Sequence, residues 1–139
     1  MRVLAVDFGE KRMGLAVSDE SGALVVPVGA VARTSDAQAA AEVAEAALSR
    51  EVTRIVVGYP RSASGIETSS ATRARNFARR LHEVSGLPVD LHDESLTTVA
   101  AESSLRELGL PPARRALARD AEAAAAILRD YLSVSRDLP

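Results

Sequence analysis

Short runs of apolar and β-branched residues, separated by turn signals, constrain the fold of this chain more than any other feature. Residues 1–8 and 13–18 are two such runs, and the Gly-Glu-Lys-Arg turn at 9–12 predicts a β-hairpin. A third run, at 23–31, is rich in valine, and Pro27 inside it indicates an edge strand or a bulge. We therefore expect the chain to begin with three strands.

The rest of the chain alternates helical segments with two short strands. Residues 35–50 are rich in alanine and glutamate, which predicts a helix with Thr34 or Ser35 as its N-cap. The order β-β-β-α-β-α-β-α-α predicts an α/β fold with a mixed five-stranded sheet and helices on both faces. We expect a single domain over 1–139, with a tail from about 134. The remaining expected elements are strands at 54–57 and 89–91, and helices at 69–85, 97–108 and 119–132.

The composition excludes several classes of protein. The chain has no cysteine, which excludes disulfides, thiolate metal sites and a cysteine nucleophile. It has no apolar run of about 18 residues and no signal-peptide pattern, so we expect a cytoplasmic protein without a membrane partner. A net charge of -2 argues against nucleic-acid binding through bulk positive charge.

Carboxylates follow the expected strands at the edge where ligands of open α/β sheets gather. Right-handed crossovers would make the first, fourth and fifth strands parallel, which brings Asp7 and the pair Asp93 and Glu94 to one edge. Asp120 stands before the apolar face of the last helix. Each also has an ordinary explanation, as a turn cap, as solvated residues at a helix start, or as an N-cap.

Taken together, Asp7, Glu94 and Asp120 favour a metal centre. Carboxylates at one edge of a sheet cannot all remain charged without a cation. Ligands that offer only oxygen favour a hard ion, Mg²⁺ or Mn²⁺. One or two such ions support phosphodiester hydrolysis in nucleases, and they would supply the positive charge that the composition lacks.

Four sequence blocks around these residues resemble the YqgF (RuvX) family, in the same order and at similar separations across nearly the whole chain. The resemblance implies an RNase H-like fold and a nuclease that matures the 5′ end of the 16S ribosomal RNA precursor. Older labels call the members Holliday-junction resolvases. The family's acidic residues fall on Asp7, Glu94 and Asp120. The blocks are 7–19, 56–60 with Gly65 and 74–81, 92–98, and Asp120 with 124–132.

Two regions depart from the family pattern. Ser95 stands where the family usually has arginine, and Ala116 and Ala118 occupy positions that are usually lysine. Both changes remove positive charge next to the expected site. They bear on how tightly a phosphate is held rather than on the fold.

Basic and small polar residues near the carboxylates are candidate substrate contacts. Two lie in the hairpin turn, where they could reach a substrate phosphate, pair with the acidic residues or be solvated. Three lie in a loop before a helix whose N-terminal N–H groups can bind phosphate, with a plain flexible loop as the alternative. The last, early in that helix, could contact a nucleic-acid strand or lie on a solvated face. In that order they are Lys11 and Arg12, then Ser62, Ser64 and Gly65, then Arg73.

Other residues of the blocks have structural interpretations. We expect Gly9 and Gly14 to meet a backbone need, either a positive φ or the close approach of a ligand. His92 is expected to be structural, and Phe8 and Phe77 to lie in the core. With 3% aromatic residues, the chain does not suit a base-stacking platform.

Several functions remain open from sequence. The first is a nuclease acting on a ribosomal RNA precursor or, as an alternative, on branched DNA. The second is a non-catalytic or catalytically weak nucleic-acid-binding module. The third is an ATP-binding domain of the actin and sugar-kinase type, but 139 residues hold only one of the two domains it needs. The nuclease could be a monomer or a homodimer, the latter being usual for a junction resolvase.

Overall fold

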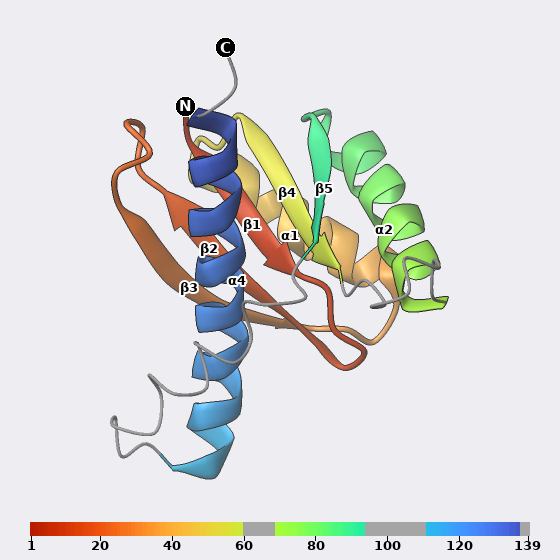
Figure 1. Cartoon of the computed structure of the whole chain (residues 1–139). Helices are drawn as coiled ribbons and strands as arrows, with labels where there is room; N and C mark the ends of the chain where they lie inside the picture. The colour runs from red at the N-terminus through yellow and green to blue at the C-terminus, as the bar shows by residue number, and fades with distance from the viewer. Residues whose placement is uncertain (60–68, 94–110, 137–139) are drawn as a thin grey trace.

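A five-stranded sheet lies at the centre of the molecule (Figure 1). The computed structural model describes residues 1–59, 69–93 and 111–136. Within these ranges no helix is long and apolar enough to cross a membrane. The elements are β1 (Val3–Asp7), β2 (Arg12–Ser18), β3 (Val25–Ala32), α1 (Asp36–Ser49), β4 (Arg54–Tyr59), α2 (Ser69–Ser85), β5 (Val89–Asp93) and α4 (Pro112–Arg136).

The strand order is β3-β2-β1-β4-β5, and the sheet is mixed as the sequence predicts. β2 pairs antiparallel with β1 and β3, while β4 pairs parallel with β1 and β5. The carboxyl ends of β1, β4 and β5 therefore meet at one edge, where Asp7, Tyr59 and Asp93 end the strands.

Helices cover both faces of the sheet, and strand alternation decides which residues face which helix. In β1, Leu4 and Val6 pack with α1 and α2, whereas Val3 and Ala5 pack against α4. Phe77 of α2 is fully buried on the first side. We refer to the two sides as the α1/α2 face and the α4 face.

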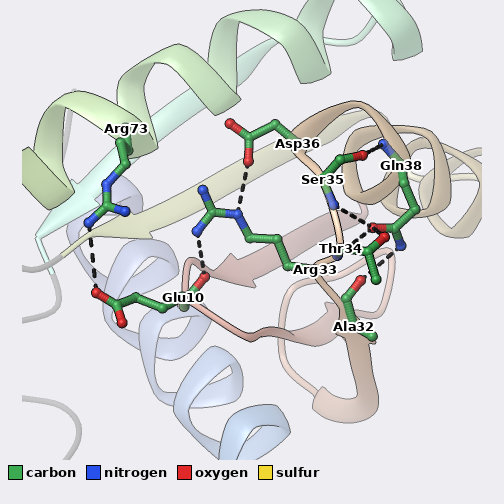
Figure 2. Close-up of polar contacts among 9 residues, drawn as sticks. Glu10, Ala32, Arg33, Thr34, Ser35, Asp36, Gln38 and Arg73 are labelled. Carbon is green, nitrogen blue, oxygen red and sulfur yellow. Dashed lines mark hydrogen bonds and ion pairs between the residues drawn. The ribbon is translucent and has the colours of Figure 1, made fainter.

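Local signals at the sheet edge and at α1 are confirmed. Ser35 is the N-cap of α1 and forms a capping box with Gln38, which also donates to the Ala32 carbonyl (Figure 2). Pro27 lies in β3, which is an edge strand, and the β2–β3 register shifts beside its partner Ala16. Proline has no backbone N–H to donate. In an edge strand one side of the backbone has no neighbouring strand, so proline can be placed there without losing a hydrogen bond of the sheet.

The last helix is longer than the sequence predicted. We expected 119–132, but α4 begins at Pro112 and ends at Arg136, so it includes residues 134–136 that we assigned to a tail. Pro112 lies in the first turn of α4, where proline is favourable because the N–H that it lacks would have no partner there. The expected helix at 97–108 lies outside the described residues.

Candidate active site

Asp7 ends β1 on the α4 face of the sheet. Val3 and Ala5 pack toward α4, and Asp7 has the same parity along the strand. Its partners on the neighbouring strands are both glycines, Gly14 on β2 and Gly58 on β4. The half-buried Asp7 therefore has a residue without a side chain beside it on each neighbouring strand.

The backbone of α4 comes very close to the sheet at Gly14. A Cβ at Gly14 would lie 1.8 Å from the backbone carbonyl oxygen of Asp120, so no other residue fits without moving the helix. Because Gly14 is also the sheet partner of Asp7, one glycine adjoins both predicted ligands. The expected close approach exists, but the approaching group is a helix backbone rather than a ligand.

Gly9 meets a similar need in the turn. A Cβ added at Gly9 would lie 2.3 Å from the Arg12 carbonyl oxygen, and the φ angle of Gly9 is not positive. Tight packing of the turn, rather than a left-handed backbone, therefore requires this glycine.

Asp120 is an interior residue of α4, more than two turns after Pro112, so the N-cap interpretation was wrong. Its carboxylate accepts a hydrogen bond from Arg12, with Nε 2.6 Å from Oδ2. The Asp120 side chain is 23% exposed and that of Arg12 is 40% exposed. Of the three roles considered for Arg12, the structure has the pairing with an acidic residue.

The hairpin turn between β1 and β2 is held by Arg33, a residue that the sequence analysis missed. The backbone N–H of Arg33 donates to the Lys11 carbonyl at 2.8 Å, and the Arg33 guanidinium donates to the Gly9 carbonyl at 3.1 Å. The same guanidinium lies 4.5 Å from the Phe8 ring centroid. It also donates to Asp36 at 2.8 Å (Figure 2). No sequence signal joins an arginine after β3 to a turn more than twenty residues earlier.

Two of the predicted substrate contacts also belong to this turn or lie beside it. Lys11 is exposed. Arg73, in the second turn of α2, lies 3.7 Å from the Glu10 carboxylate, so it borders the hairpin turn (Figure 2). Both cations are therefore at the edge of the sheet where β1 ends.

A second polar group joins β4 and β5 to α4. Asp90 accepts from Arg54 at 2.8 Å and from the Tyr131 hydroxyl at 2.5 Å. The hydrogen bond with Asp90 raises the pKa of Arg54 above its usual range. His92 lies 2.6 Å from Asp130, which is the structural role that we expected. These contacts fix the end of β5 against α4.

Several predicted site residues lie outside the described residues. Glu94, the third expected ligand, directly follows Asp93 at the end of β5. Ser62, Ser64 and Gly65 also lie outside, so their proposed role as phosphate contacts stays a prediction. Among residues 1–59, 69–93 and 111–136, no three histidine, aspartate or glutamate side chains form a metal-binding group.

The residues present nevertheless fit a hard divalent ion. The donors at this edge are carboxylate oxygens, which Mg²⁺ and Mn²⁺ prefer. The guanidinium of Arg12 already places a cation on Asp120. The strand partners of Asp7, Gly14 and Gly58, contribute no side chains of their own.

Comparison with known proteins identifies the family. A family model described as "RuvX: Holliday junction resolvase" matches residues 1–134. A protein of Anaeromyxobacter dehalogenans named "Putative pre-16S rRNA nuclease" is 47% identical over 132 residues, which cover 95% of this chain and 96% of the relative. A Chloroflexus aurantiacus protein of the same name is 38% identical over 137 residues, covering 99% of this chain and 90% of the relative.

Solved structures of resolvases share the fold. Fowlpox virus resolvase in complex with Holliday junction DNA has a TM-score of 0.62 at 10% identity, covering 97% of this chain and 99% of that one. Thermus thermophilus RuvC with its junction substrate has a TM-score of 0.57 at 19% identity, covering 99% and 97%. The chain therefore has the predicted RNase H-like fold and belongs to the RuvX (YqgF) family of hydrolytic nucleases.

Proposed function

We propose that this chain is a divalent-metal-dependent nuclease that matures the 5′ end of the 16S ribosomal RNA precursor in the cytoplasm. The observation that carries the proposal is the close approach of α4 to Gly14 of β2. That residue is the sheet partner of Asp7 and contacts the backbone of Asp120. Carboxylates from two distant parts of the chain are thus supported at one edge by a position that only glycine can fill.

In this proposal Asp7, Asp120 and Glu94 hold one or two Mg²⁺ or Mn²⁺ ions. A bound ion supplies charge stabilisation at the phosphate and lowers the pKa of a coordinated water. The chain's own contribution is orientation: the end of β1 fixes Asp7, and α4 fixes Asp120. Glu94 enters on sequence alone, as the residue that follows the last residue of β5.

Substrate binding is assigned to cations around the same edge. Lys11 is exposed on the hairpin turn, and Arg12 and Arg73 lie beside it. Arginine and lysine contacts to phosphates position a nucleic acid without reading its sequence. Ser62, Ser64 and Gly65 complete the proposed contacts from the sequence.

Relatives named for the rRNA precursor favour RNA as the substrate. The family description favours branched DNA as the second candidate. A resolvase acts through paired cuts, which suit a symmetric dimer, whereas trimming of an RNA end needs only a monomer. Solution mass measured together with cleavage of both substrates separates the two.

Membership of a nuclease family removes the sugar-kinase alternative. The non-catalytic alternative is tested by cleavage of 5′-extended 16S RNA and of a four-way DNA junction, with Mn²⁺, Mg²⁺ or EDTA. We compare the wild type with Asp7→Asn, Asp120→Asn and a control, Glu45→Gln, which changes an exposed carboxylate on α1.

We expect metal-dependent cleavage of the RNA, a loss of about a thousandfold in both Asn variants, and an unchanged rate for the control. Cleavage that persists in EDTA, or equal rates in all four proteins, would overturn the proposed chemistry. RNA binding without cleavage in the wild type would favour the non-catalytic module instead.

A further inference from the structure

The contact between Arg12 and Asp120 has a consequence for metal binding. Nε of Arg12 lies 2.6 Å from Oδ2 of Asp120, which is a short, charge-assisted hydrogen bond. The carboxylate is only 23% exposed, whereas the Arg12 side chain is 40% exposed. The guanidinium therefore already binds one oxygen of a proposed metal ligand.

The turn that carries Arg12 does not depend on this side-chain contact. Arg33, whose side chain is only 12% exposed, binds the turn through the carbonyls of Lys11 and Gly9. The backbone of Arg12 is paired in the sheet opposite Ala32. The Arg12 guanidinium can therefore change its partner while the turn keeps its place.

A guanidinium and a divalent ion cannot both bind Asp120 closely at low cost. Two cations within about 4 Å repel each other strongly where little water separates them, and the Asp120 side chain is mostly buried. In the metal-free protein the same guanidinium is favourable, because it compensates the charge of a partly covered carboxylate.

Resting on the proposed metal centre, we propose that Arg12 and the divalent ion compete for Asp120. Arg12 is then a positioning residue: it neutralises and orients Asp120 in the metal-free protein and leaves this carboxylate when the ion binds. The released guanidinium, with its planar set of donors, is suited to a phosphate of the substrate. The site would thus exchange one cation for another at a fixed carboxylate.

The test is calorimetric titration of Mn²⁺ into the full chain without RNA. We expect Arg12→Ala to bind Mn²⁺ about five- to tenfold more tightly than the wild type, because no ion pair has to be broken. The metal-free variant should melt a few degrees lower. The matched control is Arg2→Ala, which removes an exposed ion pair with Glu51 at 3.3 Å and should leave Mn²⁺ affinity unchanged.

A purely structural role for Arg12 predicts the opposite sign, because damage to the site would weaken Mn²⁺ binding. The double variant Arg12→Ala with Asp120→Asn checks that the gain acts through Asp120, since it should bind no more tightly than Asp120→Asn alone. If the wild type binds Mn²⁺ and Arg12→Ala binds it equally tightly or more weakly, the competition is overturned but the metal centre is not. No Mn²⁺ binding in any protein would overturn both.

Discussion

The two faces of the sheet are packed in different ways. On the α1/α2 face the sheet meets two helices through large side chains such as Phe8, Met13 and Phe77, and the rings of Phe8 and Phe77 lie 5.4 Å apart. On the α4 face one helix packs through Ala124 and Ala125 together with the larger Ile127 and Leu128. At Gly14 the absence of a side chain lets the α4 backbone approach the sheet closely.

We infer from this difference that the α1/α2 face mainly stabilises the fold, whereas the α4 face carries the predicted site. The predicted site residues Asp7, Arg12 and Asp120 all lie on the α4 face or at its end. Close packing there fixes the backbone that carries each carboxylate. A metal site depends on such fixed ligand positions more than on the amount of apolar surface that is buried. The α1/α2 face contains the larger of the two clusters of buried apolar residues, and no predicted ligand is among them.

The largest effect on stability is expected on the α1/α2 face. Phe77→Ala removes a fully buried ring and should lower the free energy of unfolding by about 4 kcal/mol. Leu48→Ala, at a side chain that is 56% exposed, should change it by less than about 0.5 kcal/mol. Urea unfolding gives both values. Loss of Mn²⁺ binding by the folded fraction of Phe77→Ala would contradict the division between the faces.

The next effect is expected at Gly14, where the α4 backbone lies close to the sheet. Gly14→Ala places a methyl group 1.8 Å from the Asp120 carbonyl and should cost about 3 kcal/mol, because the helix must move. Gly86→Ala is the control: its φ is +72° but nothing lies within 4 Å, so it should cost about 1 kcal/mol.

Unlike Phe77→Ala, Gly14→Ala should also weaken Mn²⁺ binding per folded molecule, since Asp120 moves with α4. If the two glycine variants unfold at the same urea concentration, the close approach of α4 at Gly14 does not affect the free energy of unfolding.

The smallest effect is expected from the polar group at β5. Tyr131→Phe removes a hydrogen bond to the Asp90 carboxylate and should cost about 1.5 kcal/mol. Tyr59 lies on the α1/α2 face, and its hydroxyl forms no hydrogen bond with the described residues. Tyr59→Phe should therefore cost less than about 0.5 kcal/mol. Equal losses in thermal unfolding would show that the Asp90 contacts do not hold β5 to α4.

Periodicity and strand order predicted most of the fold. The parallel arrangement followed from crossover handedness, and it placed Asp7 and Asp93 at one edge. The boundaries of α4 were wrong because Pro112 starts a helix as readily as it ends one. The same error moved Asp120 from the helix interior to a cap, although its place in the site was predicted.

Contacts between distant segments could not be predicted in the same way. Arg33 holds the turn at Gly9 and Lys11 through a fold that only the full sheet creates. Gly14 signalled a close approach, but a single sequence does not show that the approaching group is a helix. Pairing of Arg12 with an acidic residue was one of several options, and tertiary structure selected Asp120.

The central claim is that β1 and α4 supply one metal centre. A crystal structure of the wild type grown with MnCl₂, with anomalous scattering from manganese, tests it most directly. The account predicts an anomalous peak within about 2.5 Å of carboxylate oxygens of both Asp7 and Asp120, with the Arg12 guanidinium withdrawn from Asp120. A manganese peak that contacts neither carboxylate, with Arg12 still bound to Asp120, would contradict it.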